Sequence, residues 1–154
     1  MSKLSWNTSL EFADLFNDFF NNYYKEAALA LKEYYNAVQA HYVTLYDKYD
    51  TDGCGGFFQV KHDYSVSGDW DYPVLRSFKL ILRKGYEAIA NSDRSPEEKE
   101  KLRRRVLLED VCIDAMIRES YPLFIEDYNA FETEFRENCA ILGIRTKTEG
   151  GNTL

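Results

Sequence analysis

Three acidic side chains are the residues of this sequence most suited to chemistry. Glu109, Asp110 and Asp114 lie in a segment whose other residues are largely apolar. A buried carboxylate is costly unless it is paired, and its pKa rises if it stays unpaired. Paired carboxylates are also the catalytic groups of glycoside hydrolysis. One hypothesis is therefore a small enzyme that uses these three acids.

Two arginines favour a structural role for the same acids. Arg105 precedes Glu109 by four residues, and Arg118 follows Asp114 by four. On a helix this spacing places both members of a pair on one face. We therefore expect structural ion pairs among Arg105, Glu109, Asp114 and Arg118, and no catalytic residue.

Metal and cofactor sites are not indicated. Asp50, Asp52 and Gly53 match half of a calcium loop, but Lys48 takes the first ligand position and Gln59 the twelfth, where the loop needs an acid. Neither of the two histidines follows a glutamate by three residues, as di-iron bundles require. The three cysteines are widely spaced and odd in number, which suggests no zinc site or disulfide framework.

These side chains must be positioned by helices, because apolar residues recur every three or four positions. Residues 12–23 carry one such stripe, and Thr8 with Glu11 forms a capping box ahead of it. Residues 28–49 carry a heptad-like seam of alanine, leucine, valine and tyrosine. Both patterns predict amphipathic helices.

Three further helices are expected after a long loop. Glycines and aromatic residues interrupt the pattern over 50–71, which predicts a loop or a short hairpin. Helical spacing resumes over 75–89, over 96–117 after the capping box Ser95-Pro96-Glu97-Glu98, and over 124–142 beyond Pro122. Gly143 is typical of a helix C-cap. The sequence predicts an all-α fold, a single bundle of about five helices over 1–144 with a flexible tail over 145–154.

Composition excludes several classes of partner. The chain has 154 residues, 19 basic against 26 acidic side chains and a formal charge of −7, so nucleic acid is not an expected partner. No apolar run is long enough to cross a membrane, and the first residues lack the apolar region of a signal peptide. We expect a soluble acidic domain, whose compartment the sequence leaves open.

Aromatic side chains are the least ordinary feature. The doublets Tyr23-Tyr24 and Tyr34-Tyr35 cannot place both rings on one helix face, so one ring of each is expected to point outward. Outward tyrosines suit a protein partner or a stacked sugar. The simpler interpretation is that these rings cover the ends of the bundle.

Two blocks of sequence resemble one protein family. The first comprises KLSWNTSL at 3–10 and FFNNYYKEAA at 19–28. The second comprises Arg103–Glu109, Phe135–Cys139, the LGI stretch at 142–144 and Glu149-Gly150. Together they are similar to the helical C-terminal module of large bacterial proteins of the glycoside hydrolase type, whose barrel resembles that of α-glucuronidases. Lys25 departs from the glycine that the family has at this position.

The resemblance implies a non-catalytic accessory domain. The family's catalytic (β/α)8 barrel would lie upstream, in a longer parent protein from which this chain is an excised part. The bundle would pack on that barrel and shape one wall of its substrate cleft. Trp6, Tyr23 and Tyr24 are the expected inter-domain contacts, with Trp70 and Tyr72 near carbohydrate.

The alternative hypothesis is a free-standing bacterial or phage interaction module. It would form a homodimer along the heptad-like seam from Ala28 to Tyr49. A tight dimer that buries the seam tyrosines would favour it over the accessory domain.

Overall fold

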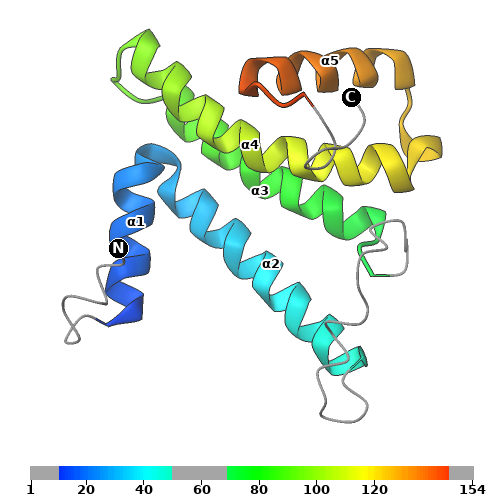
Figure 1. The fold of residues 1–154 in the computed structure, drawn as a ribbon. Coiled ribbons are helices and arrows are strands. Elements are labelled where there is room, and N and C mark those ends of the chain that lie inside the picture. Colours follow the sequence, from blue (N-terminus) through cyan, green and yellow to red (C-terminus); the bar gives the residue numbers. More distant parts are fainter. Residues whose placement is uncertain (1–10, 50–68, 146–154) are drawn as a thin grey trace.

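A computed structural model describes residues 11–49 and 69–145 (Figure 1). These residues form five α-helices and two short 3₁₀ helices, and no strand. They are α1 (Phe12–Tyr23), η2 (Lys25–Ala27), α2 (Ala28–Tyr49), α3 (Tyr72–Ala90), α4 (Pro96–Ser120), η4 (Pro122–Phe124) and α5 (Tyr128–Leu142). The predicted all-α bundle is confirmed. Trp6, most of the 50–71 loop and the tail beyond Arg145 lie outside the described residues.

The hairpin of α3 and α4 is the centre of the fold. α2 packs along α3, and α5 packs along α4, so four helices form a layered array (Figure 1). α1 reaches the rest of the chain mainly through α2 and η2, and the two helices α1 and α2 spread apart like a V (Figure 1). No helix in the described ranges is long and apolar enough to span a membrane.

The core lies where α2, α3 and α4 meet. Its most buried side chains are apolar and come from all three helices: Leu31, Leu75, Leu82, Ile89 and Val106. At Gly85 the backbone of α3 comes so close to η2 and α2 that an added Cβ would lie 3.4 Å from both Ala27 and Leu31. The heptad-like seam of α2 is therefore covered by α3 of the same chain over much of its length.

Several helix ends follow the capping signals of the sequence, but the capping box predicted for Thr8 and Glu11 is wrong, because Glu11 is itself the N-cap of α1. Ser95 and Glu98 form the expected reciprocal capping box at the start of α4. Gly143 has φ of 75°, and the Ile144 N–H donates to the carbonyl of Cys139 at 2.9 Å, so α5 ends in a Schellman motif. Pro122 ends α4 as predicted, but the following helix begins at Tyr128 rather than at Phe124, because 122–124 form a 3₁₀ turn.

The junction between α1 and α2 is strained at one residue. Lys25 has φ of +50°, a left-handed conformation that L-residues other than glycine rarely adopt. This is the position at which the resembling family has glycine. The backbone therefore takes here a shape that glycine favours, although this chain carries lysine.

Candidate functional site

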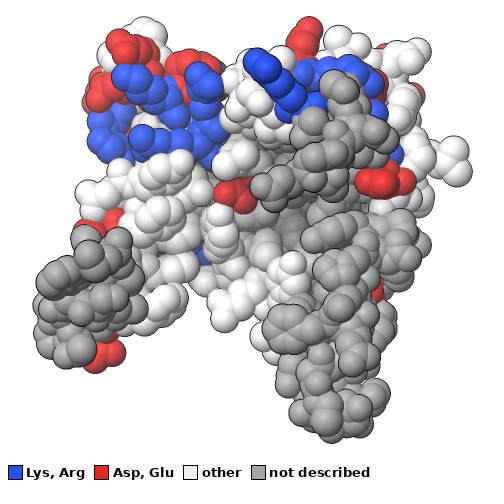
Figure 2. All heavy atoms as spheres, in the orientation of Figure 1, with Lys and Arg blue, Asp and Glu red and all other residues white. Residues whose placement is uncertain are grey.

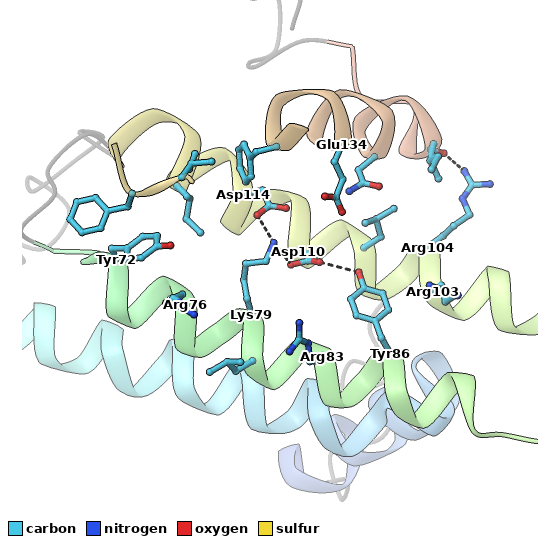
Figure 3. Close-up of a pocket in the computed structure, with 18 of the residues that line it drawn as sticks. Tyr72, Arg76, Lys79, Arg83, Tyr86, Arg103, Arg104, Asp110, Asp114 and Glu134 are labelled. Atoms are coloured by element: carbon cyan, nitrogen blue, oxygen red, sulfur yellow. Dashed lines mark hydrogen bonds and ion pairs between the residues drawn. The ribbon is translucent and has the colours of Figure 1, made fainter. Parts of the chain in front are cut away.

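A groove runs along α4 between α3 and α5. The two flanking helices both pack on α4 but hardly touch one another. The space between them has a volume of about 1260 Å³ (Figure 3). We call this space the α4 groove.

Each helix contributes a stripe of residues with helical spacing. The floor consists of α4 residues on one face of that helix: Arg103, Leu107, Asp110, Asp114 and Ile117. The α3 wall carries Tyr72, Arg76, Lys79, Leu80, Arg83 and Tyr86, and the α5 wall carries Phe131, Glu134, Asn138 and Ile141. On all three helices the lining residues recur every three or four positions. In a helical bundle, contact residues with this spacing are what a helix packs against.

An ion cluster occupies the middle of the α4 groove. Lys79 extends from α3 to α4, where its ammonium contacts Asp114 and lies 3.1 Å from Oδ1 of Asp110 (Figure 3). The Tyr86 hydroxyl donates to Oδ2 of Asp110 at 3.3 Å. The Oδ1 atom of Asp110 is buried and has the ion-pair contact but no hydrogen bond. The two acids and the lysine thus join α3 to α4.

Burial and charge act in opposite directions within this cluster. Burial raises the pKa of Asp114, and the Lys79 ammonium offsets only part of that shift. Burial lowers the pKa of Lys79, but the carboxylates of Asp114 and Asp110 more than compensate and hold it above its ordinary value. Burial also raises the pKa of Tyr86, with Asp110 adding to the shift. The phenol therefore stays protonated and acts as a donor.

Three arginines of the α4 groove have no acidic partner. Arg76, Arg83 and Arg103 form no ion pair with any carboxylate in the described part of the chain. Arg104 is held differently, since its guanidinium donates to the Ile141 carbonyl on α5 at 2.6 Å. Arg76, Arg83 and Arg103, the groove arginines from here on, are thus available to an anionic group.

Charge is segregated along the chain. Residues 76–105 contain 10 basic and 5 acidic side chains, a formal charge of +5, whereas the chain as a whole carries −7. Figure 2 shows Lys and Arg, interspersed with Asp and Glu, gathered over the part of the molecule that holds α3, α4 and α5, and few Lys and Arg over α1 and α2. The lining of the α4 groove includes five basic and five acidic side chains, so its positive charge is concentrated on the α3 wall.

The three acids considered from the sequence do not form one site. Asp110 and Asp114 face the α4 groove, but Glu109 lies on another side of α4, toward α1 and α2. There its Oε1 accepts from the hydroxyls of Tyr35 at 2.6 Å and Tyr24 at 3.2 Å. Burial, with Glu109 contributing, raises the pKa of Tyr24 to about 12. Glu109 is thus tied into the core by two phenols.

The predicted i,i+4 ion pairs are wrong in their partners. Arg105 donates to the Tyr23 carbonyl and lies 4.4 Å above the Tyr23 ring, while Asp114 binds Lys79. Arg118 pairs with Glu132 of α5, with Nη2 2.8 Å from Oε1. All these interactions are structural, but each joins α4 to another helix: α1 through Arg105, α3 through Asp114 and α5 through Arg118.

The aromatic residues proposed from the sequence as contacts differ in their exposure and in their neighbours. Tyr23 is 39% exposed, while Tyr24 is 4% exposed and offers almost no surface to a partner. Trp70 packs against His41 and Tyr42 of α2 and against Phe78. Tyr72 lies at one end of the α4 groove, with its ring 4.9 Å from that of Phe124.

Sequence reasoning missed the basic residues of the α4 groove. Tyr72, Arg76, Lys79, Arg83 and Tyr86 are spaced by three and four residues, a polar stripe beside the apolar one of α3. That spacing could have been noticed. It does not reveal which helix the stripe faces.

The described residues contain no group of three or more His, Cys, Asp or Glu side chains placed to hold a metal ion. No protein-family model, curated protein or solved structure matches the chain. The resemblance to a glycoside hydrolase module therefore stays a prediction.

Proposed function

We propose that the chain is a non-catalytic helical binding module whose α4 groove receives an acidic amphipathic helix. The observation that carries the proposal is an open groove between three helices, with three arginines along it that have no acidic partner among the described residues. Helix-in-groove recognition combines apolar anchors with matching charges. Leu80, Leu107 and Ile141 provide the apolar contacts here.

The pairing of the acids supports a binding role over a catalytic one. Asp110 and Asp114 share Lys79, and Asp110 also accepts from Tyr86. Their charges are thus engaged within the chain. Only about one third of the Lys79 side chain is exposed, so a ligand in the groove would contact only that part of it.

The accessory-domain role is compatible with this proposal. A parent enzyme could supply the helix, and the exposed rings of α1 would be available to the barrel. That role stays a prediction, which rests on the resemblance alone.

Two designed peptides test the proposal. Both are short stapled helices with the same leucine face, one with glutamates along one flank and the other with lysines at those positions. We expect only the acidic peptide to bind, measured by fluorescence anisotropy, and to shift the methyl NMR signals of Leu80, Leu107 and Ile141. Arg83→Glu should remove this binding, while the exposed control Lys101→Glu should not. Equal binding of both peptides, or binding of neither, would overturn the proposal.

A further inference from the structure

We propose that the helix received by the α4 groove carries charges of both signs, with acids on the flank that faces α3 and a lysine or arginine on the flank that faces Glu134 of α5. This inference rests on the proposed function. It adds the second flank of the partner and the rule that sets the direction in which the partner lies. Glu134 becomes the residue that selects among acidic helices.

Charge is divided between the two walls of the α4 groove. Among the lining residues, the α3 wall contributes three cations and no acid: Arg76, Lys79 and Arg83. The α5 wall contributes Glu134 and no cation, and Glu126, just before α5, adds a second acid. The other charged lining residues belong to the α4 floor, where both signs occur. A helix in the groove therefore meets opposite charges on its two flanks.

Glu134 presents an unpaired charge on the α5 wall. Figure 3 shows its side chain pointing from α5 into the groove. The residue is exposed, and it forms no ion pair or hydrogen bond within the described ranges 11–49 and 69–145. By contrast, Glu132 on the same helix is held by Arg118 and Arg136. Glu134 is therefore available to a cation that a partner supplies.

The middle of the groove favours such a cation. Asp110 and Asp114 share the single ammonium of Lys79. Glu134 is close enough to Asp114 for its charge to contribute to the raised pKa of that carboxyl. These three carboxylates and one ammonium leave an excess of negative charge. A lysine or arginine of the partner would offset it, whereas an acid at the same place would be repelled.

The spacing of the charges predicts their order on the partner. Arg76 and Arg83 are seven residues apart, about 10.5 Å along α3. Lys79 lies between them in the sequence and reaches Asp114, near which Glu134 lies. We therefore expect two acids seven residues apart on one flank of the partner, with the cation on the other flank at a level between them.

Unlike flanks also set the direction of the bound helix. If the helix is turned end for end with its apolar face still on the α4 floor, its two flanks exchange walls. A helix with acids on one flank and bases on the other therefore satisfies both walls in one direction only. Two isoleucines mark the ends of the groove. Ile125 follows Phe124, whose ring lies 4.9 Å from that of Tyr72, and the Ile141 carbonyl accepts from Arg104 at the other end.

Two peptides that differ only in the second flank test the inference. Both keep the leucine face and the glutamate flank of the acidic model peptide, and the opposite flank carries lysines in one and glutamates in the other. By fluorescence anisotropy at low ionic strength, we expect the parent chain to bind the lysine-flanked peptide about fivefold more tightly, the effect of a favourable exposed ion pair. Glu134→Lys should reverse this preference. Glu137→Lys makes the same charge change at an exposed α5 position outside the groove lining and should keep it.

A spin label at the N-terminus of the lysine-flanked peptide reports its direction. It should broaden the methyl NMR signals of either Ile125 or Ile141. A peptide with its two flanks exchanged should broaden the signals of the other isoleucine, because it lies in the opposite direction. Circular dichroism checks that both variants of the chain are folded.

The outcomes separate this inference from the proposed function. Equal binding of the two peptides, or a preference that Glu134→Lys does not reverse, overturns the charged second flank and leaves the groove as a site for acidic helices. Reversal by Glu137→Lys as well, or broadening at the same isoleucine with both flank arrangements, also overturns it. Binding of neither peptide overturns the inference, and if the acidic model peptide also fails to bind, the proposed function fails with it.

Discussion

Replacement of Lys79 by methionine removes the cation that pairs with both Asp110 and the buried Asp114. Methionine keeps much of the aliphatic stem, so the change acts mainly on charge. At the 3.1 Å that separates Lys79 Nζ from Asp110 Oδ1, an effective dielectric constant of about 20 gives an attraction of about 5 kcal/mol. Desolvation of the ions opposes this attraction. Removal of one partner of a buried pair costs about 3–5 kcal/mol, and the lysine is 33% exposed, so we expect a loss near 3 kcal/mol.

The pH dependence of this loss identifies its cause. Because burial raises the pKa of Asp114, the folded state holds that proton more tightly than the unfolded state. Stability from this group therefore falls as pH rises from the ordinary carboxyl pKa to the raised one. Without the ammonium the pKa of Asp114 rises further, so the loss in Lys79→Met should be small near pH 4 and larger near pH 7.

Urea denaturation at about pH 4.5 and about pH 7.5 measures both effects. The matched control is Lys84→Met on the same helix, where Lys84 pairs with Glu33 at the surface. Exposed pairs contribute about 0–1 kcal/mol, so the control should change little. A loss from Lys79→Met that equals the control, or that is the same at both pH values, would refute a buried ion cluster between α3 and α4.

Substitutions at two further positions test the packing of the helices. Lys25→Gly should raise the free energy of unfolding by about 0.5–1 kcal/mol, because glycine tolerates φ of +50°, whereas Lys25→Val should lower it. Chemical denaturation measures both, and equal stabilities would contradict the strained junction. Gly85→Ala should raise the thermal midpoint slightly, since the new Cβ meets Ala27 and Leu31 at ordinary contact distance and helix propensity improves by about 1 kcal/mol. Gly85→Leu should instead lower the free energy of unfolding by about 1–3 kcal/mol, because the larger side chain forces α3 away from α2. A Gly85→Leu variant as stable as the parent would contradict the close packing of α3 on α2.

Local spacing was sufficient to predict the helices. α2 has the bounds of its heptad-like seam, and α4 begins at the capping box of Ser95 and Glu98. Such signals act within one or two turns of a helix, so they can be read without knowledge of the fold. The same rules predicted the glycine cap at Gly143.

The α4 groove could not be predicted in this way. Glu109 and Asp110 are neighbours in the sequence, yet Glu109 accepts from Tyr24 at the end of α1 and from Tyr35 of α2, whereas Asp110 pairs with Lys79 of α3. Successive residues of a helix point about 100° apart, and what each side chain meets depends on the neighbouring helices. Arg118 likewise pairs with Glu132 rather than with Asp114.

The sequence by itself determined which segments are helical, where most of them end and that apolar and acidic residues share α1. Only the tertiary structure decided that half of the α1 stripe stays exposed, because α1 meets little more than α2 and η2. It also decided that α3 and α5 stand apart on α4 with the groove arginines between them. The physical reason is that helix formation depends on contacts a few residues apart, whereas the faces that helices bury depend on packing between distant segments.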